Sequence, residues 1–191
     1  MTASGSQASS SLARWSGLAA MVGGALWVLK GGLIMLGRPD PDLLIPAELF
    51  FAFGLLGLHT RLDQRGGWPA KIGGLLAYVA LALTAVNAPY SLFFAEDGPR
   101  TPFPFNVTYF AASVAIFVGL ASLGLAVLRT RLWPPRWRVL PLGLGLSALL
   151  PVWALALVHL ELPVVLLGLG WVLFGYALWA GKSETPRRST R

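Results

Sequence analysis

The sequence contains no cysteine and only two histidines, His59 and His159, among its 191 residues. Without thiols the protein cannot form disulfides, thiolate metal sites or redox dithiol pairs. The two histidines fall near opposite faces of the membrane arrangement derived below, so they cannot jointly hold one zinc ion or haem. The sequence therefore predicts no metal site and no cofactor.

Signatures of common catalytic sites are missing as well. There is no glycine-rich phosphate-binding loop. The segment around Ser147 lacks the second glycine of a nucleophile elbow, and His159 lies three turns further along the same predicted helix, too far away to activate that serine. Enzymatic activity is left open on these grounds, and we favour a non-enzymatic protein.

Charged residues are scarce and hydrophobic residues abundant. Only 12% of the chain is charged and 55% is hydrophobic, whereas a typical soluble domain is about 25% charged. The charges cluster between long apolar runs, which indicates a lipid bilayer. These runs are too long and continuous for barrel strands, and backbone polar groups must be paired in lipid. We therefore expect an all-α integral membrane bundle.

Six apolar runs predict six transmembrane helices within one membrane domain, residues 14–181. The predicted helices are about 15–36, 43–60, 72–94, 106–128, 139–160 and 163–180. Residues 1–13, rich in serine and other small residues, are expected to form a disordered cytoplasmic tail. Residues 182–191 are expected to form a basic cytoplasmic tail.

Basic residues fall almost entirely on one side of this arrangement. Twelve of the fifteen lysines and arginines lie in alternate loops or at the termini, and only Arg38 and Arg100 lie in the loops of the other side. Basic loops stay cytoplasmic, so we expect a protein of the bacterial plasma (inner) membrane with both termini on the cytoplasmic side. This asymmetry accounts for the net charge of +7, and nucleic acid is not expected as a partner.

Lys30 and Glu48 are the two charges that lie well inside apolar runs. Each is nine residues from Pro39, which places them at a similar depth in a helical hairpin, roughly 10 Å from its outer end. A charge near the bilayer centre costs about 2.5–3.5 kcal/mol and needs a partner or water. We expect an intramembrane ion pair, which either only locks the hairpin or lines a cavity open to the outside.

Further polar side chains recur at the same outer depth. In the third helix, small and polar residues at spacings of three or four predict a stripe that faces the bundle interior: Ala77, Ala80, Thr84, Asn87 and Ser91. The candidate ligand-binding residues are Lys30, Glu48, Asn87, Tyr90, Tyr109 and His159. Their one-sided distribution predicts a small polar pocket near the extracytoplasmic face, in a protein that binds a lipid or small molecule or regulates a partner.

An enzyme and a transporter both stay open as hypotheses. Glu48 and His159 are weak catalytic candidates, because they could act as acid and base of a membrane-embedded lipid-modifying enzyme if they converge. A small solo transporter would need polar groups along its whole path, and the inner half of the predicted bundle has few.

Small residues on the first helix recur at spacings that permit close helix packing, in the pairs Ala19/Gly23 and Ala20/Gly24. These faces predict packing inside the bundle, or docking of a membrane-protein partner or of a second copy in a homo-oligomer.

The predicted arrangement resembles the substrate-capture subunits of energy-coupling-factor vitamin importers. The shared features are six helices, both ends inside, this spacing of small residues and an outer polar pocket. The resemblance covers topology and this spacing, and it implies capture of a vitamin-type substrate. In composition the chain is similar to multi-pass membrane proteins of high-GC bacteria.

Overall fold

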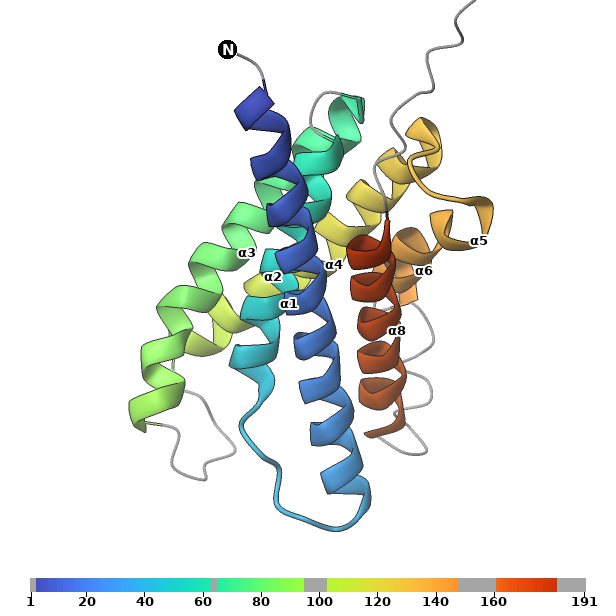
Figure 1. The fold of residues 1–191 in the computed structure, drawn as a ribbon. Helices are drawn as coiled ribbons and strands as arrows, with labels where there is room; N and C mark the ends of the chain where they lie inside the picture. The colour runs from blue at the N-terminus through green and yellow to red at the C-terminus, as the bar shows by residue number, and fades with distance from the viewer. Residues whose placement is uncertain (1–2, 63–64, 95–102, 148–160, 182–191) are drawn as a thin grey trace, which may run out of the picture.

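The computed structural model describes residues 3–62, 65–94, 103–147 and 161–181, and these residues form helices joined by short connections, with no strand among them. The long helices are α1 (Ala3–Met35), α2 (Leu44–Leu62), α3 (Gly67–Phe94), α4 (Phe105–Thr130) and α8 (Glu161–Ala180). Two short helices, α5 (Pro135–Arg138) and α6 (Leu140–Ser147), follow α4 (Figure 1). The predicted all-α fold is confirmed.

Four of the described helices are long and apolar enough to cross a membrane: Arg14–Met35 within α1, Gly67–Ser91 within α3, Phe105–Thr130 and Glu161–Ala180. Helix α2 is a fifth long helix. Helix α6 begins close to the start of the predicted fifth span, and residues 148–160 of that span lie outside the described residues. The predicted count of six helices fits this arrangement.

The start of α1 differs from the prediction. The helix begins at Ala3, so residues 3–13, expected to be a disordered tail, are helical in this structure. Helix nucleation is costly, whereas extension of a helix that already exists is cheap. The apolar part of α1 supplies the nucleus, and the alanines, serines and glutamine before it have propensities that permit extension. The predicted basic tail, residues 182–191, lies outside the described residues.

Helices α1 to α4 alternate in direction, and α8 runs in the same direction as α2 and α4, so the helix ends gather at two ends of the bundle (Figure 1). We call one the aspartate end, because it holds the connection between α1 and α2 with Asp40 and Asp42. The other, the arginine end, holds the last turns of α2, α4 and α8 together with α5. Arg14 of α1 also lies at this end, over the ring of Trp179 in the last turn of α8.

Arginine side chains make specific contacts at the arginine end. Arg61 of α2 donates hydrogen bonds to the carbonyl oxygens of Leu178 (2.8 Å) and Gly181 (3.1 Å), which are left without helical partners at the end of α8. The guanidinium of Arg129 lies 5.4 Å from the ring centroid of Trp68. The basic side chains thus tie together helix ends that are far apart in sequence.

Glycines bring α1 and α8 into close contact. On α1 they recur every seven residues, and on α8 two of them have the same spacing: Gly17, Gly24 and Gly31 against Gly168 and Gly175. A Cβ atom on Gly24 would lie 2.5 Å from the carbonyl oxygen of Gly168, which is too close for a non-bonded contact with a backbone atom. Gly23 faces Ala47 and Phe51 of α2. The small residues at positions 23 and 24 therefore pack inside the bundle, one of the two predicted uses of this face.

The interior is apolar and rich in aromatic rings. Phe51 of α2 stacks on Trp171 of α8 with ring centroids 4.1 Å apart, and Trp27 of α1 meets Phe51 edge-on at 5.3 Å. On α3, the residues of the predicted stripe from Ala77 to Asn87 are buried, which confirms that the stripe faces the interior. The outward faces of α3, α4 and α8 carry large apolar side chains, which is compatible with a membrane protein.

Candidate functional site at the aspartate end

Helix α1 ends in a glycine motif that turns the chain back toward α2. Gly37 adopts a left-handed conformation, with φ of 71°. The N–H of Arg38 donates to the carbonyl of Leu33 at 3.0 Å, and the N–H of Gly37 donates to that of Ile34 at 2.9 Å. These are the two bonds of a Schellman motif, which satisfies the free carbonyls at a helix end.

The connection that follows is fixed to the bundle on two sides. Lys30 of α1 forms an ion pair with Asp40 and donates a longer hydrogen bond, 3.4 Å, to the carbonyl of Pro41. On the other side, Ser91 of α3 donates a hydrogen bond to Oδ2 of Asp42 at 2.6 Å. The two aspartates of the connection therefore have different partners, one a cation and the other a neutral hydroxyl.

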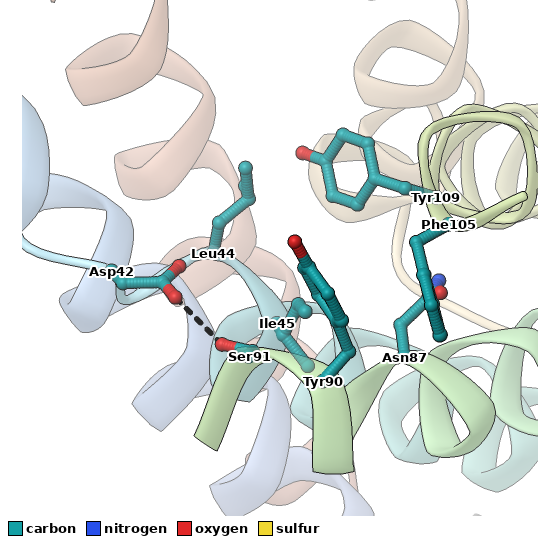
Figure 2. Close-up of a pocket in the computed structure, with 8 residues that line it drawn as sticks. All are labelled: Asp42, Leu44, Ile45, Asn87, Tyr90, Ser91, Phe105 and Tyr109. Atoms are coloured by element: carbon teal, nitrogen blue, oxygen red, sulfur yellow. Dashed lines mark hydrogen bonds between the residues drawn. The ribbon is translucent and has the colours of Figure 1, made fainter. Parts of the chain in front are cut away.

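A cavity of about 130 Å³ lies between α2, α3 and α4 at this end. It is lined by Asp42, Leu44, Ile45, Asn87, Tyr90, Ser91, Phe105 and Tyr109. In Figure 2 the carboxylate of Asp42 and the hydroxyls of Tyr90 and Tyr109 point toward the same space. A cavity of about 150 Å³ is known to hold benzene, so this one has room for a small molecule or for one group of a larger ligand.

Asn87 and an aromatic pair form the wall between α3 and α4. The side chain of Asn87 is 2% exposed; its Oδ1 accepts a hydrogen bond from Thr108 at 2.7 Å, and its Nδ2 has no hydrogen-bond partner among the described residues. The ring of Tyr90 stacks on Phe105 with centroids 4.3 Å apart and planes inclined by 18°. A buried donor left without a partner costs about 1–3 kcal/mol. The Asn87 amide is thus a donor that a ligand could satisfy.

Asp42 gives the cavity a negative charge. It lies two residues before Leu44, the first residue of α2, where the dipole of the helix stabilises an anion. The described residues offer Asp42 no cationic partner, since Lys30 pairs with Asp40. A cation that entered the cavity would therefore meet a carboxylate without displacing an existing ion pair.

Glu48 lies one helical turn deeper than the cavity lining. It follows Leu44 by four residues on α2, and its partner Ser113 follows Tyr109 by four residues on α4. Ser113 donates a 2.5 Å hydrogen bond to Oε1 of Glu48, while Oε2 has no partner in the described part of the chain. Tyr109, which lines the cavity, lies one helical turn before Ser113 on α4. The buried acid and its serine partner therefore lie directly beneath the cavity lining on α2 and α4.

The predicted ion pair between Lys30 and Glu48 is wrong, because Lys30 contacts Asp40 and Glu48 contacts Ser113. The reason is the register of α1 against α2. Gly23 faces Ala47, so Lys30, seven residues further along α1, lies about 10 Å beyond the level of Glu48. Helix α1 extends past the start of α2 at the aspartate end (Figure 1). Equal distances from Pro39 in sequence therefore do not give equal depths.

Three of the six predicted site residues, Asn87, Tyr90 and Tyr109, line the cavity. Lys30 and Glu48 do not line it. His159 lies outside the described residues, so its convergence with Glu48 stays a prediction.

Sequence reasoning missed three polar groups and one aromatic group of this site. Ser91 lies on the predicted interior stripe, one turn after Asn87, but the stripe alone gives it no role. Asp42 could have been found from its position just before the first turn of α2. Ser113 could have been found from its spacing of four from Tyr109. The place of Phe105 depends on its contact with the Tyr90 ring, for which the sequence carries no signal.

No group of three or more His, Cys, Asp or Glu side chains is placed to hold a metal ion within the part of the chain that the structure describes. Comparisons with protein-family models, with curated proteins and with solved structures found no match for this chain. The functional argument therefore rests on the chemistry and geometry of the cavity.

Proposed function

We propose that this is a non-enzymatic multi-pass membrane protein whose cavity at the aspartate end binds a ligand through an ammonium group. The observation that carries the proposal is the carboxylate of Asp42, which shares the cavity with three aromatic rings and has no cationic partner among the described residues. Carboxylates and aromatic faces are the groups that attract an ammonium ion. With both termini cytoplasmic, as the basic loops predict, the cavity opens at the extracytoplasmic face.

The interior beyond the cavity favours binding over transport. Between Glu48 and the arginine end, α2 and α4 bury apolar side chains that include Phe51, Leu55, Ile116 and Leu120. A cation that moved along this path would lose its water without gaining polar partners. A solo transporter is therefore less well supported than a binding protein.

A vitamin-importer subunit and a lipid-modifying enzyme also have less support than ligand binding. Gly23 and Gly24 are used in packing against α2 and α8, so the resemblance to vitamin-importer subunits rests on topology. A lipid-modifying enzyme would require His159 beside Glu48, and His159 is outside the described residues.

Calorimetric titration of the purified protein in a neutral detergent with tetramethylammonium tests the proposal. Asp42→Asn keeps the shape of the side chain and removes its charge, so affinity should fall at least about tenfold. Glu161→Gln is the matched control, because Glu161 is an acid at the same end, on α8, and does not line the cavity. Tetramethylammonium that fails to bind, or that binds Asp42→Asn as well as the unaltered protein, would refute the ammonium site.

A further inference from the structure

A second hollow adjoins the cavity on the outward side of α3 and α4. It has a volume of about 330 Å³ and is lined by Val86, Pro89, Tyr90 and Phe105, so its wall is almost entirely apolar. Val86 is 59% exposed, which places the hollow on a face that meets acyl chains when the bundle is in a bilayer. Tyr90 and Phe105 line both spaces. The polar cavity and the apolar hollow therefore meet at this stacked pair.

We infer that the ligand is an amphiphile, with an ammonium head group in the cavity and an acyl chain in the hollow between α3 and α4. This inference rests on the proposed function, because it takes the ammonium site as given. An ammonium-bearing phospholipid has the required chemistry. A lipid whose head group is only anionic does not, because the Asp42 carboxylate would repel it and the described lining residues include no lysine or arginine.

The sizes of the two spaces support this division of the ligand. The cavity of about 130 Å³ accommodates a head group and not an acyl chain. The hollow lies where the chain of a membrane lipid already resides, so the lipid can bind without leaving the bilayer. Tyr90 suits the boundary between them, since its hydroxyl points into the cavity and its ring packs on Phe105.

Native mass spectrometry of the protein in lipid nanodiscs tests the inference. The probes are phosphatidylethanolamine and phosphatidylglycerol with identical acyl chains, because they differ in the ammonium group. We expect the protein to retain phosphatidylethanolamine at least about tenfold better than phosphatidylglycerol. Equal retention of both lipids would overturn the assignment of an ammonium-bearing amphiphile.

A bulky side chain in the hollow tests the place of the acyl chain. Val86→Trp should lower retention of phosphatidylethanolamine about tenfold. Val79→Trp is the matched control, because Val79 is also exposed and lies two turns earlier on the same helix, away from the hollow. Val86→Phe, a smaller obstruction, repeats the test if Val86→Trp does not fold.

The outcomes separate this inference from the proposed function. If Val86→Trp retains phosphatidylethanolamine fully and Asp42→Asn loses tetramethylammonium binding, the assignment of the acyl chain to the hollow is refuted. The ammonium site is then still supported. Tetramethylammonium binding that survives Asp42→Asn would remove the ammonium site, and the amphiphile inference would fall with it.

Discussion

Removal of the Ser113 hydroxyl should destabilise the bundle through Glu48. The Glu48 side chain is 2% exposed, and the Ser113 hydroxyl makes the hydrogen bond that its carboxyl accepts in the described structure. Ser113→Ala would leave both carboxyl oxygens without a partner. A buried polar group in that state costs about 1–3 kcal/mol, whereas hydrogen bonds between membrane helices average about 0.6 kcal/mol and reach about 1.7 kcal/mol. We expect Ser113→Ala to lower the free energy of unfolding by about 1–2 kcal/mol.

A double-mutant cycle isolates the contact itself. Glu48→Met removes both acceptor oxygens and keeps a side chain of similar length. In combination with Ser113→Ala, it should give a coupling free energy of about 1 kcal/mol. The matched cycle combines Glu48→Met with Lys30→Met. Because Lys30 pairs with Asp40, the effects of these two substitutions on the free energy of unfolding should be additive to within about 0.3–0.5 kcal/mol.

Equilibrium unfolding by dodecyl sulfate in mixed micelles, followed by the fluorescence of the eight tryptophans, measures all of these variants. Strong coupling in the Lys30 cycle together with additivity in the Ser113 cycle would refute the structural assignment. It would restore the ion pair that spacing alone suggests.

Two further predictions concern packing and topology. Gly24→Ala should lower the free energy of unfolding by about 1–3 kcal/mol, because the new Cβ atom would clash with the backbone of α8. The control is Gly32→Ala on the same helix, where nothing lies within 4 Å of the added atom, so the free energy of unfolding should stay unchanged or rise slightly. Equal losses of stability in the two variants would contradict the packing argument. Since the chain has no cysteine, Arg38→Cys should react with an impermeant maleimide added to intact cells, whereas Arg65→Cys should react only after permeabilisation; the reverse pattern would invert the predicted topology.

Apolar runs were sufficient to predict most of the helices, because a helix that crosses lipid needs a long run without charges. The last helix, for example, was predicted to begin at Pro163 and begins at Glu161. The segment 3–13 was not predictable in the same way. It has no apolar periodicity to indicate a helix, and its conformation follows from the helix that it extends.

At the cavity, periodicity found Asn87, because a polar residue on a stripe of small residues must face the interior. Periodicity could not give the register between α1 and α2. That register is set by Gly23, which allows the backbones to approach at the level of Ala47 and Phe51, and the sequence does not say which residues of α2 such a glycine will meet.

The register that separates Lys30 from Glu48 also determines the charge of the cavity. Helix α1 extends beyond the start of α2, so the connection passes Lys30 on its way back, and Asp40 takes the cation. Asp42 then faces Ser91, a neutral donor that leaves its charge uncompensated. If Lys30 lay at the depth of Glu48, its ammonium group would be deeper in the bundle than the connection and could not neutralise Asp40. Because α1 extends beyond the start of α2, Lys30 neutralises Asp40, and Asp42 is left as the anionic group of the proposed ligand site.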